Sequence, residues 1–149
     1  MNKLVSISAV FLLSLFFSGC GKKKGCTNIN SINYDADAEK DDGSCGEAIL
    51  IAYPQHHGAA IAGLSTYPDS AFVKYNATNS PGSNPSAYDK IFVGLPGDTF
   101  VTITGLAKGP YFIMMAGFDT AVNQRVTGGI PHSLSSSSGE TSLVVPVTE

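Results

Sequence analysis

Hydrophobic residues are distributed in three ways along the chain. An apolar run extends over Leu4–Phe17, a polar stretch rich in Asn and Asp follows it, and short apolar segments separated by turn residues occupy the chain from Glu47 onward. The first pattern is typical of a secretory h-region, because a helix that spans a membrane needs about 20 apolar residues. The last pattern predicts β-strands.

The segment 47–149 is expected to fold as an all-β domain of the β-sandwich class, with little helix. Its apolar segments are rich in Val, Ile, Thr, Tyr and Phe and are bounded by Gly, Pro, Asn and Ser. In one of them Thr99, Val101 and Ile103 share a face, which is expected to point toward the core. In chain order, the predicted strands are Ala48–Tyr53, Ala71–Asn76, Tyr88–Val93, Asp98–Thr104, Tyr111–Gly117, Val126–Leu134 and Thr141–Val147.

Cys20 directly follows the apolar run, after the small residues Ser18 and Gly19. A basic start, an apolar run and small residues before a cysteine resemble the signal peptide of a bacterial lipoprotein. The resemblance implies that 1–19 is removed and that Cys20 is acylated, which leaves 20–25 as a lipidated tether to a membrane. The alternative is an ordinary signal peptide that leaves a free cysteine.

The residues after the anchor bear on which membrane holds the protein. Gly21 stands where an Asp would favour retention in the inner membrane of some bacteria, so the outer membrane is expected. The basic run Lys22–Lys24 differs from the acidic surface-export tags of some lipoproteins and favours the periplasmic face. The sequence leaves the choice between the periplasmic and the surface face open.

The chain has three cysteines, Cys20, Cys26 and Cys45. If Cys20 carries lipid, the other two are left as one pair, and an exported protein meets an oxidising compartment. A Cys26–Cys45 disulfide is therefore expected, with two free thiols as the alternative. Such a disulfide would stabilise the fold by about 3 kcal/mol on the chain-entropy account.

The segment 26–45 has too few apolar residues to build a core, so it needs a covalent link. It resembles short modules of the form C-T-x-x-x-A-x-N-Y-x-x-x-A-x-x-D-D-G-S-C that recur in secreted and surface proteins of some bacteria. Ser31 departs from this pattern, which has Ala there. The matching residues are Cys26, Thr27, Asn33, Tyr34, Ala38, Asp41, Asp42, Gly43, Ser44 and Cys45.

The same module carries hard oxygen ligands of the kind that calcium favours. These candidate calcium ligands are Asn33, Asp35, Asp37, Asp41 and Asp42. An EF-hand is excluded, because its sixth and twelfth positions hold Ala38 and Ser44 instead of Gly and Glu. A different calcium loop is one interpretation. The other is a set of solvated turn residues, since Asp-Asp-Gly-Ser strongly favours a turn.

Part of the β segment resembles a carboxypeptidase-regulatory-like (transthyretin-like) domain. The resemblance rests on Thr102–Tyr111, with the pattern Gly-Leu-x-x-Gly-x-Tyr after a strand, on Ala116–Phe118, and on the turn Gly58–Gly63. The segment Ser65–Ala87 is a long insertion relative to that family. The resemblance implies a seven-stranded β-sandwich in a non-catalytic module that binds, spaces or supports folding.

Composition and motifs argue against several functions. The net charge is −3 and charged residues make up 14% of the chain, so no basic surface for nucleic acid is expected. The chain has no Gly-x-Ser-x-Gly and no phosphate-binding loop between strand and helix. We therefore expect a lipid-anchored envelope protein that is not an enzyme and that binds an unidentified protein or glycan. An envelope hydrolase would require Ser, His and Asp to converge in the fold.

Histidines, tyrosines and two short triplets are further candidates. The adjacent His56 and His57 should point to opposite faces of an extended chain, so a metal site would need His132 brought close to them. A polar turn is the simpler interpretation. Two triplets resemble bacterial O-glycosylation acceptors: Asp69-Ser70-Ala71 and Asp119-Thr120-Ala121. An aromatic platform for sugars could draw on Tyr53, Tyr67, Tyr75, Tyr88 and Tyr111.

Overall fold

The computed structural model describes residues 21–29, 31–135 and 139–149. The predicted signal peptide and the lipidation site Cys20 lie outside the described residues. Within the described ranges the chain is almost entirely β, and its one helical element is the 3₁₀ turn η1 (Pro85–Ala87). No helix in these ranges is long and apolar enough to span a membrane. The predicted all-β class is confirmed.

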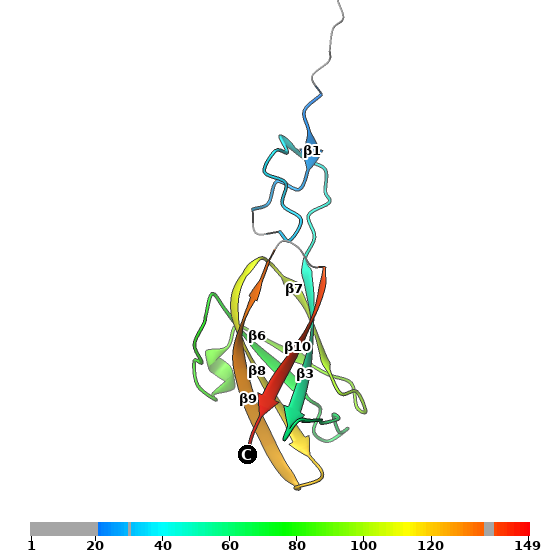
Figure 1. The fold of residues 1–149 in the computed structure, drawn as a ribbon, viewed down its shortest axis with the longest axis vertical. Helices are drawn as coiled ribbons and strands as arrows, with labels where there is room; N and C mark the ends of the chain where they lie inside the picture. Colours follow the sequence, from blue (N-terminus) through cyan, green and yellow to red (C-terminus); the bar gives the residue numbers. More distant parts are fainter. Residues whose placement is uncertain (1–20, 30, 136–138) are drawn as a thin grey trace, which may run out of the picture.

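Two sheets face one another in the larger part of the molecule (Figure 1). In the first, β10 pairs in parallel with one edge of β3, and β7 and β4 pair antiparallel with its other edge. The second has the order β6-β5-β8-β9 and is antiparallel throughout. The strands of these sheets are β3 (Ala48–His56), β4 (Ala59–Ala60), β5 (Ser70–Tyr75), β6 (Lys90–Val93), β7 (Val101–Leu106), β8 (Gly109–Asp119), β9 (Gln124–Leu134) and β10 (Glu140–Val147).

The hydrophobic core lies between the two sheets. Alternate residues of β3 are buried, as a strand with one face toward a core requires, and Leu50 has no exposed surface. Val101 and Ile103 are also fully buried, which confirms the predicted core face for these two residues, whereas Thr99 precedes the strand and is half-buried. The strand β7 begins later than predicted and runs past the predicted end at Thr104 to Leu106, because Ala48 of β3 pairs with Leu106.

Strand β8 is buried on both faces along its first half. Ile113 and Met115 point into the core between the sheets. Phe112 and Met114 lie on the opposite face and pack with Tyr88 in a second, smaller cluster. Because both faces of this part of β8 are covered, its sequence is the most apolar in the β domain. The connection between β5 and β6 includes the second part of the predicted insertion Ser65–Ala87, and it folds back over the outer face of its own sheet, where Ala77 and Ala87 pack against this smaller cluster.

The two sheets are joined by backbone hydrogen bonds beside the point where β9 meets the end of β10. Thr127 and Thr148 exchange two backbone hydrogen bonds, with N···O distances of 2.8 and 2.9 Å. At the next residue, Gly128, an added Cβ would overlap the carbonyl oxygen of Pro146 and lie 2.8 Å from Cα of Val147. The backbones meet there because Gly128 carries no side chain.

A small N-terminal module sits at one end of the sandwich, above β7 and β3 in Figure 1. It contains the parallel pair β1 (Lys24–Gly25) and β2 (Lys40–Asp41) and the disulfide Cys26–Cys45, which confirms the predicted pairing. Ser31 is buried, and its hydroxyl donates to the carbonyl of Gly46. That hydrogen bond satisfies the buried hydroxyl of Ser31, the residue that departs from the sequence pattern of the module.

Candidate functional site

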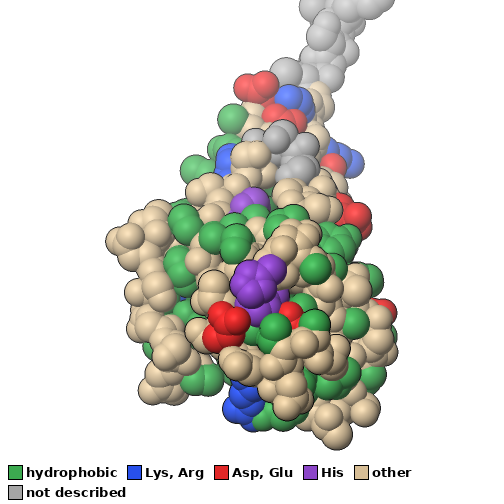
Figure 2. All heavy atoms as spheres, turned by 60° about the horizontal axis from the view of Figure 1, so that its bottom comes forward, with side chains coloured by type: hydrophobic (Ala, Val, Ile, Leu, Met, Phe, Trp, Pro, Cys, Tyr) green, Lys and Arg blue, Asp and Glu red, His purple; other side chains and the backbone are tan. Residues whose placement is uncertain are grey.

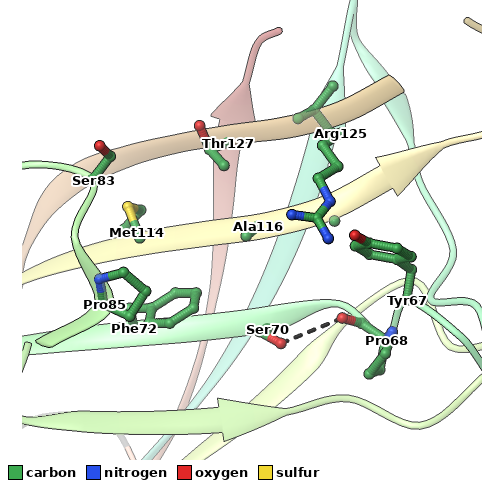
Figure 3. Close-up of a pocket in the computed structure, with 12 residues that line it drawn as sticks. Tyr67, Pro68, Ser70, Phe72, Ser83, Pro85, Met114, Ala116, Arg125 and Thr127 are labelled. Carbon is green, nitrogen blue, oxygen red and sulfur yellow. Dashed lines mark hydrogen bonds between the residues drawn. The ribbon is translucent and has the colours of Figure 1, made fainter. Parts of the chain in front are cut away.

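A groove of about 260 Å³ lies on the outer face of the second sheet (Figure 3). The strand register builds its floor, because Ser70, Ala116 and Thr127 form one cross-strand row. Phe72 and Met114 pair in a neighbouring row on the same face. The floor is therefore apolar at its centre and carries hydroxyl groups toward its edges.

One wall of the groove is the connection between β5 and β6, which contributes Ser83 and Pro85. The Tyr88 hydroxyl donates to the carbonyl of Gly82 at 2.8 Å and ties this connection down over Met114. A second hollow of about 240 Å³ adjoins the groove and shares Ser83, Met114 and Thr127 with it. The two hollows follow the same outer face.

The opposite end of the groove carries a cation on an aromatic stack. The guanidinium carbon of Arg125 lies 4.2 Å from the ring centroid of Tyr67, and that ring packs against Phe118 at 5.5 Å. Figure 3 shows the guanidinium directed over the tyrosine and into the groove. None of the ion pairs found among the described residues includes Arg125. A guanidinium held in this way has N–H groups available to an anionic ligand.

A cluster of polar side chains outside the groove occupies the end of the sandwich remote from the N-terminal module. Figure 2 shows histidines beside acidic side chains on this surface. His56, at the end of β3, is 2% exposed, and its Nδ1 lies 2.7 Å from Asp119 Oδ2. Its Nε2 lies 3.5 Å from Glu149 Oε1 and has no hydrogen-bond partner. The His57 ring stacks on His56 at a centroid distance of 4.0 Å.

Hydrogen bonding and charge shift the acidity of this cluster. The hydrogen bond to Asp119 and the nearby charge of Glu149 raise the pKa of His56 against the opposing effect of its burial. The hydrogen bonds from His56 and from the backbone N–H of Ala121 lower the pKa of Asp119. Asp119 therefore orients the imidazole and favours Nδ1–H, which leaves Nε2 facing Glu149.

The expectation that His56 and His57 point apart is wrong. His57 and Gly58 both have positive φ, at 50° and 78°, and they connect β3 to β4 as a two-residue hairpin turn. The chain is thus not extended at His57, and the turn brings its ring back over the preceding one. The polar turn that the sequence suggested is present at His57 and Gly58, whereas His56 is the last residue of β3.

The other residues proposed from sequence lie elsewhere. His132, on β9, pairs with Tyr111 of β8. At about 3.3 Å per residue, Tyr111 lies roughly 26 Å along β8 from Asp119, so His132 does not join His56. Burial lowers its pKa. The exposed Thr120 lies with Ala121 in the β8–β9 turn, whereas Asp69 is almost fully buried. Thr120 is thus the more exposed of the two acceptor hydroxyls, because Ser70 is half-buried in the floor of the groove.

The candidate calcium ligands have separate partners within the module. Lys23 Nζ lies 3.0 Å from Asp35 and 3.3 Å from Asp37, and this cation lowers the pKa of Asp35. Asp41 and Asp42 each accept a hydrogen bond from a backbone N–H two residues later. Calcium binding by these residues stays a prediction from the sequence.

Asn33, the remaining candidate calcium ligand, forms hydrogen bonds with the backbone at the end of the module. Its Oδ1 accepts from the N–H of Gly46 at 2.7 Å, and its Nδ2 donates to the carbonyl of Ser44 at 2.6 Å. Across the described residues, the one group of three His, Cys, Asp or Glu side chains whose ligand atoms all lie within 4.8 Å of one another is elsewhere: His56, His57 and Glu149.

Comparison with known proteins adds no assignment: no family model, curated protein or solved structure matches the chain. The groove and the residues that form it are therefore the main evidence on function. Sequence reasoning named Tyr67 only as one of several tyrosines and gave Arg125 no role. A signal that could have drawn attention to Arg125 is that it is the one arginine in the sequence.

Proposed function

We propose that this chain is a lipid-anchored, non-enzymatic binding module of the bacterial cell envelope. The observation that carries the proposal is the groove of about 260 Å³ with an apolar floor and the guanidinium of Arg125 at its end. A binding site of this kind combines a mostly apolar lining with a few placed polar groups. Acylation of Cys20 would supply the anchor, as its place after the apolar run indicates.

The chemistry of the groove selects a ligand with an apolar body and an anionic group. Phe72, Met114 and Ala116 offer apolar surface, and Arg125 has no carboxylate partner among the described residues. A carboxylate can accept two parallel hydrogen bonds from a guanidinium. Peptide carboxylates and acidic glycans share this chemistry. Because the Tyr67 ring already packs against Arg125 and Phe118, it has less surface to offer a neutral sugar.

The strand arrangement supports the finer fold assignment as part of this proposal. Apart from the two-residue β4, the larger part of the molecule consists of β3 and β5 to β10, distributed over two facing sheets. This is the strand number expected for a sandwich of the carboxypeptidase-regulatory-like kind. The Ser65–Ala87 insertion that departs from that family supplies Tyr67 and the wall at Pro85, so the departure builds the groove.

The histidine cluster offers little support for the alternative of a hydrolase. A nucleophilic triad needs a hydroxyl hydrogen-bonded to the imidazole nitrogen opposite the carboxylate. His56 has the carboxylate, Asp119, on Nδ1, but its Nε2 faces Glu149 and bonds no hydroxyl among the described residues. We therefore assign the module no catalytic residues.

Binding of a matched pair of probes tests the groove. We expect the full chain in detergent to bind 4-phenylbutyrate about fivefold more tightly than the uncharged 4-phenylbutanol, because an exposed ion pair contributes about 1 kcal/mol. Arg125→Ala should abolish this difference while leaving weak binding of the alcohol. The measurement is a titration followed by NMR chemical shifts of the methyl groups of Met114 and Ala116.

The control is Lys108→Ala, which removes a cation remote from the groove at the β7–β8 turn. It should leave the preference for the carboxylate unchanged. Equal binding of the two probes by the unaltered chain, or shifts confined to residues outside the groove, would contradict the proposal.

A further inference from the structure

The histidine cluster at the remote end of the sandwich has a feature that the groove does not explain. His56 Nε2 is a buried imidazole nitrogen whose contact with Glu149 Oε1, at 3.5 Å, is too long for a well-formed hydrogen bond, and it has no other partner among the described residues. Leaving such an atom unpaired costs free energy, so a buried polar atom normally has a partner. It points to the place where Glu149 and the stacked ring of His57 come together. Each of the three residues can present one ligand atom, all within 4.8 Å of one another.

We propose that His56, His57 and Glu149 bind one divalent transition-metal ion, with Zn²⁺ and Cu²⁺ as the fitting ions. Two imidazoles and a carboxylate form a donor set that both ions accept. Tetrahedral ligands at 2.0–2.1 Å from a metal are separated by about 3.3 Å. The 3.5 Å between His56 Nε2 and Glu149 Oε1 is already close to that separation.

Asp119 completes the site as a positioning residue. Imidazoles that bind metals usually donate their other N–H to a carboxylate, which fixes the ring and its tautomer. The 2.7 Å contact between Asp119 Oδ2 and His56 Nδ1 has this form. Asp119 is itself held, because its Oδ1 accepts a hydrogen bond from the N–H of Ala121 at 2.7 Å. The imidazole is therefore preoriented toward the metal position.

The exposure of the outer ligands indicates an accessible site. His57 is exposed and the Glu149 side chain is 47% exposed, whereas His56 is buried beneath them. Three protein ligands leave at least one coordination position for water or for a group from a partner. None of the three ligands, nor Asp119, lines the Arg125 groove, so the two sites are built from different residues.

Metal titration of the untagged full chain in detergent tests this inference. We expect isothermal titration to show one Zn²⁺ or one Cu²⁺ per chain, and the Cu²⁺ complex to show coupling to two imidazole nitrogens in its EPR spectrum. His57→Asn and Glu149→Gln should each weaken binding at least tenfold. Asparagine is chosen because it tolerates the positive φ at this position. Both ligands are exposed, so these variants should fold.

Two further variants separate a built site from incidental histidine binding. Asp119→Asn should weaken binding about 10- to 100-fold while the two-nitrogen EPR signature persists, as expected for a residue that acts through the imidazole. His132→Ala should leave the affinity unchanged, since His132 lies far along β9. The inference is overturned if neither ion binds at submillimolar concentration, or if His132→Ala weakens binding as much as His57→Asn.

Discussion

Replacing Gly128 with alanine is expected to lower the free energy of unfolding by about 3 kcal/mol or more. The new Cβ would overlap the carbonyl oxygen of Pro146 and lie 2.8 Å from Cα of Val147. Both atoms belong to the backbone of β10, which is held by its parallel pairing with β3, so neither can move away as the end of a side chain could. The substitution would force β9 and β10 apart where the two sheets meet.

Urea denaturation followed by tyrosine fluorescence measures this effect. Gly139→Ala is the matched control, because Gly139 precedes β10 and an added Cβ there meets no atom within 4 Å. It should change stability by less than about 0.5 kcal/mol. A Gly128→Ala variant as stable as the unaltered chain would show that the close approach of β9 and β10 is not required.

Because of Asp69, the free energy of unfolding is expected to fall by about 2 kcal/mol as the pH rises from 4 to 8. Its side chain is 1% exposed, neither carboxylate oxygen has a hydrogen-bond partner, and it lies against Ile61 and Gly117. Burial raises the pKa of this group from 3.8 to about 6. Well below pH 3.8 the carboxyl is protonated in both states and has no effect, and the loss of stability accumulates mainly as the pH rises from 3.8 to about 6. Above pH 6 the folded state must hold an unpaired buried charge, whereas the unfolded state does not.

Asp69→Asn should therefore remove most of this loss. The informative quantity is the stability of the variant minus that of the unaltered chain, which should rise by about 2 kcal/mol between pH 4 and pH 8. His56, whose raised pKa also favours folding at lower pH, cancels in this difference because it is present in both proteins. Glu140→Gln, at an exposed position, should show no such rise. A flat difference for Asp69→Asn would contradict the assignment of an ionisable buried Asp69.

The sequence predicted the parts of the fold that depend on local patterns. Alternation and β-branched content located most strands, and cysteine counting found the Cys26–Cys45 pair. The parallel pairing of β3 with β10 was not predicted, because it joins segments about 90 residues apart and leaves no local signal. The extension of β7 to Leu106 was missed for a related reason, since pairing with Ala48 outweighed the turn tendency of Gly105.

The candidate sites were harder to predict than the fold. The Arg125 groove depends on strand register, which aligns Ser70 with Ala116 and Thr127 from three separate segments. The histidine cluster depends on the positive φ of His57, which an alternation rule for extended chains cannot represent. Neither Asp119 nor Glu149 stands near His56 in the sequence. Each site is thus a property of tertiary arrangement, although its residues are individually visible in the sequence.

The mass of the N-terminal peptide from chain purified out of membranes tests the lipid-anchored account most directly. The account predicts a peptide that begins at Cys20 and carries a diacylglyceryl group on Sγ, and chain that partitions into the detergent phase. Replacement of Cys20 with Ser should abolish both properties while leaving the Cys26–Cys45 disulfide intact. A mature chain that begins at an unmodified Cys20, or one that retains residues 1–19, would contradict the account.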